Sequence, residues 1–280
     1  IMKKLIYSFG IILLFASCTE NIDFDLNTDK ARLVVEGQIS SGKAKHFIKL
    51  TQSTSYFFNE ETPLVTNAMV SLSDGTNSWT MTEEKPGYYY TPEITPESNK
   101  TYSLSINADG ENYKATEFME NPIKGDTVSI VLSDTYDTDS NKLVPAYSLF
   151  LFVREPEGLG DNYLWKYWLK RPDSAWKNMT PTFSDWIYRN DDFVDGNSPV
   201  KGWELFSDIP LEEMPPGTQV RLETYKISTA YYNFLDAVSK QTNRSGFFDG
   251  PPANIPSNID NGALGYFSIS GLDMLSTVVN

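Results

Sequence analysis

Cysteine and histidine are almost missing from this chain, whose 280 residues include one of each, Cys18 and His46. A single thiol cannot form an internal disulfide, so a fold held together by disulfide bonds is excluded. The single histidine begins a predicted strand. One histidine cannot supply the HExxH motif of a zinc protease, and no nucleophile motif stands near it for a histidine-based catalytic triad. We therefore expect a protein that has no resident metal or cofactor and is not an enzyme.

Basic residues are also scarce. The chain has 23 Lys and Arg against 37 Asp and Glu, which gives a net charge of −14. Such a surface repels phosphate backbones, so nucleic acid is excluded as a principal partner. Aromatic residues make up 14% of the chain. Disordered chains contain few aromatic residues and therefore cannot bury enough apolar area to offset the entropy lost on folding. The sequence therefore predicts a folded chain of one large or two modest domains.

The first residues have the three parts of an export signal. Lys3 and Lys4 precede an apolar run over residues 5–15, and two small residues then lead to Cys18. The run is shorter than the roughly 20 apolar residues that a membrane-spanning helix needs. We interpret residues 1–17 as a signal peptide that is removed. A plain secretory signal, with Cys18 left as an incidental free thiol, is the alternative.

The segment that ends at Cys18, Leu-Phe-Ala-Ser-Cys, resembles the bacterial lipobox, with Phe15 where an aliphatic residue is usual. This resemblance implies that Cys18 is acylated and holds the mature protein in outer-membrane lipid. Residues 18–29 are short and polar, which is typical of a tether. Their acids resemble the surface-export signal of Bacteroidota lipoproteins, which implies a body outside the cell: Glu20, Asp23 and Asp25. A solvated leader without such a signal is the alternative.

Residues 30–120 alternate between strand patterns and turn signals. They contain three predicted hairpins: residues 33–39 with 46–50, 70–72 with 79–81, and 102–106 with 113–115. Asp74 and Gly75 supply the positive φ that a tight hairpin turn requires. Hairpins at this spacing predict an antiparallel β-sandwich. Their order resembles transthyretin-like, Ig-like and carboxypeptidase-regulatory-like modules, which implies a scaffold.

The pattern breaks at residues 120–125, where we expect a domain boundary. Residues 121–280 predict a second, irregular β-rich domain, so the fold class is mainly β. It contains one short amphipathic helix near residues 229–241, which Ser228 or Thr229 can cap. The residues expected to face the core recur every four positions: Ala230, Phe234 and Val238.

Two acidic loops are weak candidates for chemistry. Residues 137–141 begin like a calcium loop, but Lys142 and Ser148 stand where an EF-hand needs glycine and glutamate. A solvated loop is favoured there. The second loop is equally weak evidence and contains Asp191, Asp192, Asp195 and Asn197. Hydrolysis by paired carboxylates stays open, because the sequence does not give their separation in space.

Residues 163–203 are rich in aromatic side chains, which dominate ordinary cores but also binding hot spots. Alternation along a strand places Tyr163, Trp165 and Tyr167 on one face and Trp168 on the other. The stretch is either core or a surface for a ligand or partner. Its candidate contact residues are Trp165, Trp168, Trp176, Trp186 and Trp203.

Three landmarks together resemble the Bacteroidota lipoproteins of domain-of-unknown-function family 4249: Cys18, the segment RLVVEGQI at 32–39 and the segment PSNIDNGALGYF at 256–267. The resemblance implies an accessory lipoprotein of a starch-utilisation-type (Sus-type) TonB-dependent system for nutrient uptake, either glycan or peptide. Its partners would be a TonB-dependent transporter and the substrate-binding lipoprotein of that transporter. The alternatives are a surface hydrolase that uses carboxylates and an adhesin or structural spacer.

Overall fold

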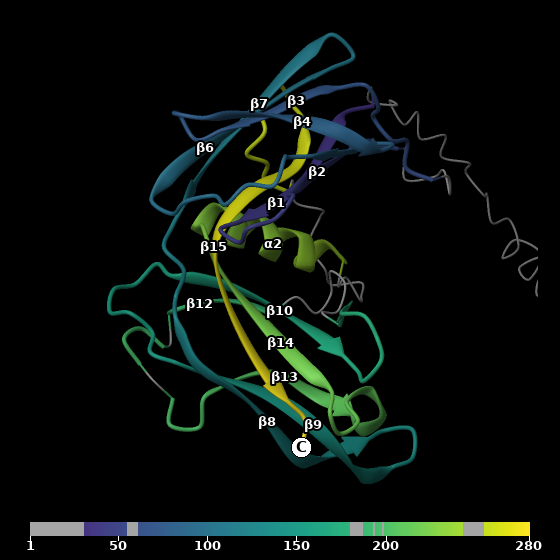
Figure 1. The fold of residues 1–280 in the computed structure, drawn as a ribbon, viewed down its shortest axis with the longest axis vertical. Coiled ribbons are helices and arrows are strands. Elements are labelled where there is room, and N and C mark those ends of the chain that lie inside the picture. Colours follow the sequence, from purple (N-terminus) through teal and green to yellow (C-terminus); the bar gives the residue numbers. More distant parts are fainter. Residues whose placement is uncertain (1–30, 55–60, 180–186, 193, 198, 243–254) are drawn as a thin grey trace, which may run out of the picture. The chain divides into compact units, whose positions relative to one another are not determined.

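A computed structural model describes residues 31–54, 61–179, 187–192, 194–197, 199–242 and 255–280. The fold is mainly β, as predicted from the sequence (Figure 1). In chain order the elements are β1 (Leu33–Ser40), β2 (Phe47–Gln52), β3 (Met69–Ser73), β4 (Ser78–Lys85), β5 (Tyr88–Tyr90), β6 (Lys100–Ala108), β7 (Glu111–Met119), β8 (Gly125–Asp137), β9 (Lys142–Val153), β10 (Asn162–Lys170), β11 (Lys177–Asn178), β12 (Ile187–Asn190), β13 (Trp203–Pro210), η2 (Leu211–Glu213), β14 (Gln219–Ile227), α2 (Thr229–Thr242) and β15 (Leu264–Val278).

The three predicted hairpins are present as the antiparallel pairs β1–β2, β3–β4 and β6–β7. The turn between β3 and β4 shows why the local sequence suffices. Gly75 has φ +85°, and the carboxylate of Asp74 accepts hydrogen bonds from the backbone N–H groups of Thr76 and Asn77 at 2.9 and 2.6 Å. Lys100 forms an ion pair with the same carboxylate at 2.9 Å. These bonds hold the pKa of Asp74 well below its usual range, the backbone bond from Asn77 contributing most.

One sheet joins the two halves of the described chain through its last strand. Residues 264–270 of β15 pair in parallel with β1, and residues 271–278 pair antiparallel with β14. The resulting twelve-stranded sheet has the order β11-β10-β14-β15-β1-β2-β5-β4-β3-β6-β7, with β12 also on β10. In Figure 1, β15 is the long yellow strand that passes from one half to the other.

Two apolar cores lie along this sheet. In the first, alternate residues of β1, β2, β3 and β6 share one cluster, so the sheet curls over itself there. In the second, β10, β14 and β15 pack against a separate three-stranded sheet of order β13-β9-β8. Residues 31–280 form one compact unit. The division into a sandwich over residues 30–120 and a second domain over 121–280 stays a prediction.

The predicted helix is α2, and its N-cap is Ser228, whose Oγ accepts the backbone N–H of Tyr231 at 3.1 Å. Of the predicted face, Phe234 does pack against the sheet, with its ring 5.1 Å from that of Tyr266, but the prediction was wrong at Ala230. Tyr231 and Leu235 are the buried residues, and Ala230 is exposed. Helix α2 turns this face toward a third apolar cluster on the sheet, where the ring of Tyr231 lies 5.0 Å from that of Tyr266. An aromatic ring buries more apolar area than the alanine beside it, which favours this rotation.

The close parallel pairing of β1 with β15 predicts that adding one methyl group at Gly265 lowers the stability of the fold. A Cβ at Gly265 would lie 2.1 Å from the carbonyl oxygen of Val35, whereas a Cβ at Gly75 would meet no atom within 4 Å. Both glycines have nearly the same positive φ, so the backbone strain is matched. We expect Gly75→Ala to lower the free energy of unfolding by about 1 kcal/mol and Gly265→Ala by about 3 kcal/mol or more. Urea unfolding measures both, and equal losses would contradict this contact between β1 and β15.

Candidate functional site

The structure distributes the predicted contact tryptophans among different environments. Trp165 and Trp203 are buried in the second core, with exposed fractions of 0% and 7%. Trp168 and Trp176 are half-buried on the opposite face of β10 and just beyond it. Trp186 lies outside the described residues. The alternation expected along β10 is confirmed, because the core contains Tyr163, Trp165 and Tyr167 but not Trp168.

The two half-buried tryptophans already hold a partner within the chain. The guanidinium of Arg221, from β14, lies 5.0 Å from the ring centroid of Trp168 and 4.8 Å from that of Trp176. Glu223, also on β14, forms an ion pair with the same guanidinium at 3.2 Å. An arginine held over aromatic faces is a favourable cation–π arrangement. This cluster therefore accounts for both tryptophans as packing partners of an arginine.

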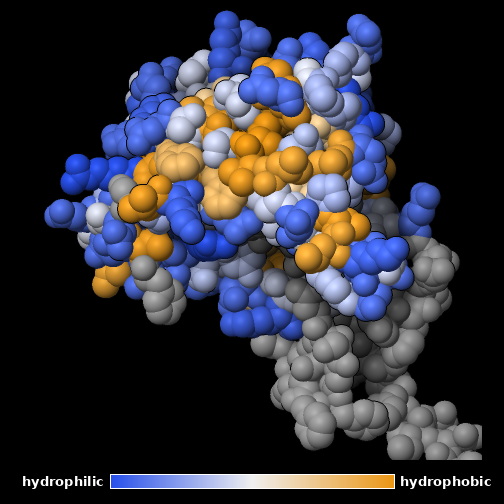
Figure 2. All heavy atoms as spheres, turned by 90° about the horizontal axis from the view of Figure 1, so that it is seen from below, coloured by the Kyte–Doolittle hydropathy of each residue, from blue (hydrophilic) through white to orange (hydrophobic). Residues whose placement is uncertain are grey.

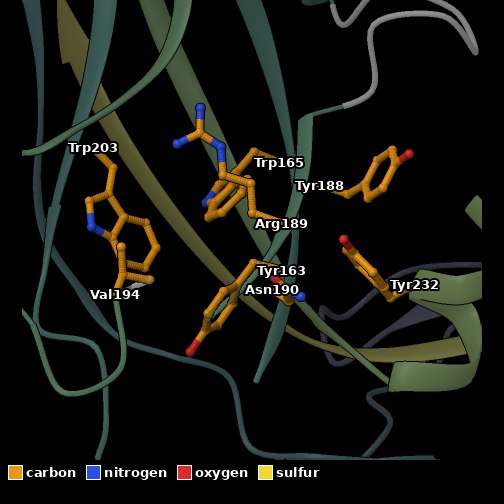
Figure 3. Close-up of a pocket in the computed structure, with 8 residues that line it drawn as sticks. All are labelled: Tyr163, Trp165, Tyr188, Arg189, Asn190, Val194, Trp203 and Tyr232. Atoms are coloured by element: carbon orange, nitrogen blue, oxygen red, sulfur yellow. The ribbon is translucent and has the colours of Figure 1, made fainter. Parts of the chain in front are cut away.

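A pocket of about 340 Å³ opens beside the buried tryptophans (Figure 3). Its lining comes from β10, β12, β13, α2 and the loop at 191–197: Tyr163, Trp165, Tyr188, Arg189, Asn190, Val194, Trp203 and Tyr232. In Figure 3 the ring of Trp203 lies at one end and the rings of Tyr188 and Tyr232 at the other. The pocket is therefore walled by aromatic rings along its length.

The aromatic walls are held by contacts between rings. The ring centroids of Trp165 and Trp203 are 5.8 Å apart in an edge-to-face arrangement, and Tyr188 meets Tyr232 in the same way at 5.4 Å. Tyr188 and Tyr232 are only half-buried, so their surfaces can be reached. Sequence reasoning did not select these two residues. Tyr188 falls within the aromatic stretch, but Tyr232 is on a helix 44 positions later, and only the fold brings them together.

The polar lining of the pocket is uneven. Arg189 is exposed and, among the residues that the structure describes, forms no ion pair. Asn190 uses its side-chain amide to donate a hydrogen bond to Asp192 at 2.6 Å. Arg189 therefore offers a cation and hydrogen-bond donors at the edge of an otherwise aromatic pocket.

An acidic cluster lies directly behind the pocket wall. Carboxylate oxygens of Glu155, Asp191 and Asp195 all lie within 4.8 Å of one another, and the first two side chains are buried. The hydroxyl of Tyr163, a pocket residue, lies 3.0 Å from a carboxylate oxygen of Glu155 and 3.1 Å from one of Asp161, so the two acids share its single proton. The sequence identified Asp191 and Asp195 as members of an acidic loop, but gave no signal that Glu155 joins them.

Backbone amides satisfy these carboxylates. Glu155 accepts from the N–H of Gly196 at 2.6 Å, and Asp191 accepts from the N–H of Gly160 at 2.9 Å. Asp195 accepts from the N–H of Gly158 at 2.6 Å. Carboxylate oxygens are ligands that Ca²⁺ takes, but here each side chain already ties one loop to the other. Loop closure between residues 155–161 and 191–197 accounts for the cluster.

Burial sets the electrostatics of this cluster. It raises the pKa of the Glu155 carboxyl, and it raises the pKa of the Tyr163 hydroxyl far above the usual range, with the nearby carboxylates adding to the effect. Lys226 forms an ion pair with Asp161 and lies 4.9 Å from the ring centroid of Tyr163. The hydroxyl of Tyr163 and the ammonium group of Lys226 therefore interact with the acidic cluster and not with the interior of the pocket.

The other candidates from the sequence are structural. His46 is buried just before β2, and its ring lies 3.1 Å from the carbonyl oxygen of Gly42, while burial lowers its pKa. Asp137 ends β8, and its carboxylate accepts the backbone N–H of Asp139 at 3.0 Å in an exposed turn. Neither residue lies among those that line the pocket.

Comparison with known families identifies the group to which this chain belongs. The family model described as "Domain of unknown function (DUF4249)" matches residues 19–274. The chain is a member of the DUF4249 family. A search of curated proteins found no match. None of the helices in the described part of this DUF4249 protein has the length and hydropathy of a membrane-spanning segment.

The raised pKa of Glu155 in this DUF4249 protein predicts a pH dependence of stability. The folded state binds the proton more tightly than the unfolded state, whose pKa is about 4.3. The stabilisation is therefore complete below that value and is lost as the pH rises through the folded pKa. We expect Glu155→Gln to flatten the decline in unfolding free energy above about pH 4, measured by urea unfolding across pH. The exposed Glu157, as Glu157→Gln, is the matched control, and an unchanged slope for Glu155→Gln would contradict the prediction.

Proposed function

We propose that this protein is a lipid-anchored lipoprotein of the outer membrane of a Bacteroidota cell, facing the exterior. Its role would be that of an accessory binding subunit in a Sus-type TonB-dependent uptake system, without enzymatic activity. The export-signal pattern, the lipobox resemblance at Cys18 and the acidic tether at 18–29 support the location. The aromatic pocket supports the binding role, and it is the observation that carries the proposal.

The lining of the pocket defines the ligand that would fit. Aromatic walls favour a flat or ring-shaped apolar surface, which a sugar ring or an amino-acid side chain offers. Arg189 at the edge favours a group that accepts hydrogen bonds, above all a carboxylate. We therefore propose that the ligand presents a ring next to an acidic group, as in an acidic oligosaccharide or the carboxyl end of a peptide.

The carboxylates nearest the pocket favour binding over hydrolysis. Glu155 and Asp191 are buried. Glu155 accepts hydrogen bonds from Tyr163 and from the N–H of Gly196, and Asp191 accepts the N–H of Gly160. A general acid or base must reach the reacting atom within hydrogen-bond distance, directly or through one water molecule. Tyr163 stands between Glu155 and the pocket, which argues against that use.

Truncating the pocket edge should weaken binding without unfolding the protein. We expect Tyr188→Ala and Tyr232→Ala each to weaken ligand binding by about 2 kcal/mol, which is roughly thirtyfold in Kd, because each variant removes one aromatic ring from the pocket wall. Calorimetry of the mature chain with acidic oligosaccharides in one arm and peptides in the other measures this and separates the two sources. Tyr88→Ala, in an aromatic group with Phe47 elsewhere on the surface, is the matched control. Failure of both arms, or equal losses in all three variants, would contradict the pocket.

Membrane attachment depends on one residue in this proposal. Cys18→Ala removes the acylated thiol, and several acyl chains hold a protein in lipid almost irreversibly. We expect the variant to move from the sedimenting membrane fraction to the soluble fraction, and the wild type to be cleaved when intact cells are treated with protease. An unchanged membrane pool would contradict acylation at Cys18. Full protection of the wild type from protease would contradict the external orientation.

A further inference from the structure

Strand β8 is an open edge of the three-stranded sheet. It spans thirteen residues and pairs with β9 along its length. Among the described residues, no backbone hydrogen bond joins residues 126–136 to any strand other than β9. Every second residue of such a strand presents an unpaired N–H and C=O along the free edge, which is a template for one more strand.

The middle of β8 has the composition of a pairing surface. Residues 127–133 read TVSIVLS and carry no charge, no proline and no glycine. Val131 and Leu132 are 43% and 58% exposed, and they point to opposite faces of the sheet. On β9, Phe150 and Phe152 are half-exposed on the face turned away from the core. Figure 2 views the molecule from below Figure 1, which is the end where β8, β9 and β13 lie. This face shows an apolar band bordered by hydrophilic residues.

Two other edges among the described strands, β7 and β13, are protected, whereas β8 is not. At the β7 edge, Lys114 and Asp260 form two hydrogen bonds. The backbone N–H of Lys114 donates to the carboxylate of Asp260 at 2.6 Å, and the backbone N–H of Asp260 donates to the carbonyl oxygen of Lys114 at 2.9 Å. At the β13 edge, two shifts of register disturb the strand, and Pro210 ends it. Bulges, prolines and covering loops are the usual protection of edges. In β8 the one irregularity lies at its start, between Gly125 and Thr127.

Charge indicates which partner this edge would accept. From 125 to 141 the chain has no lysine or arginine and four acids: Asp126, Asp134, Asp137 and Asp139. A second copy of the chain would bring the same acids into one seam, and like charges across paired strands are destabilising. A strand from another protein with lysine or arginine at its ends would meet opposite charges instead.

We propose that β8 is a strand-addition site for an extended segment of a partner protein, uncharged in its centre and basic at its ends. Backbone hydrogen bonds to residues 127–136 would supply the affinity, and the exposed Val131 and Leu132 would pack against the side chains of the added strand. The site is separate from the aromatic pocket and does not depend on what that pocket binds. It would give this protein a surface for assembly with a partner.

The test uses the mature protein and a blocked nine-residue peptide of alternating threonine and valine with a lysine at each end. Hydrogen exchange followed by mass spectrometry should show slower exchange in residues 127–136 as peptide is added, and no change in β3 or β4. The same peptide N-methylated at alternate amides should not protect these residues, because it cannot form the backbone ladder. Protection nowhere up to millimolar peptide, or equal protection by the methylated peptide, would overturn the proposal.

Variants of the protein separate the edge from its charge. Val131→Lys should weaken peptide binding at least tenfold, whereas Met69→Lys, at an exposed position on a strand paired on both sides, should leave it unchanged. Asp134→Asn with Asp137→Asn should weaken binding severalfold and reduce its salt dependence. Equal binding by Val131→Lys and the wild type would overturn the site. A dimer that forms without peptide and protects residues 127–136 would overturn the choice of a partner over a second copy.

Discussion

The described fold depends on the double pairing of β15. One length of backbone pairs with β1 before Gly271 and with β14 from that residue onward. The change of partner requires close approach, because a Cβ at Gly271 would lie 2.5 Å from the backbone nitrogen of Pro122 and 2.6 Å from the carbonyl oxygen of Glu120. The segment at 120–122 therefore crosses β15 where its partner changes. Because Val34 pairs with Leu264, 230 positions apart, this ladder closes a larger loop than any other pair of described strands, and its closure entropy is correspondingly large.

Local signals predicted the parts of this fold that local interactions build. Asp74 and Gly75 form a turn whose geometry depends on the residues beside them, so the β3–β4 hairpin could be predicted. The parallel pairing of β1 with β15 could not, because no short-range pattern distinguishes Gly265 as a position where two backbones meet. The helix and the packing of Phe234 could be predicted, but the burial of Tyr231 in place of Ala230 could not, since it depends on the surface that α2 meets. The site could likewise be predicted only in part. Alternation along β10 predicted which side chains share a face, but no local pattern showed that Tyr232, from α2, would line the same pocket.

The buried acids behind the pocket wall are satisfied by backbone amides more than by basic side chains. Around the pocket wall, Lys226 is the cation that meets the acids, through Asp161. Glu155 and Asp191 instead accept N–H groups from glycine-rich loops, where the backbone can approach without a side chain between. Charge-assisted hydrogen bonds of this kind are roughly twice as strong as neutral ones, which offsets part of the cost of burying the acids. Burial still prevails at Glu155, whose pKa stays raised.

The loop network and the aromatic pocket share Tyr163 and the loop that carries Asp191, Val194 and Asp195, so we expect them to be energetically coupled. Val194 lines the pocket, and its neighbours Asp191 and Asp195 are the acids that hold the loop at 155–161. A ligand that packs against Val194 binds the ordered loop better than a displaced one, and by linkage it stabilises the hydrogen bonds behind the wall. The reverse holds as well, because an intact network keeps the pocket wall in place before the ligand arrives and so lowers the ordering cost of binding. In the proposed binding role, the acids would therefore influence recognition through the position of the wall, without touching the ligand themselves.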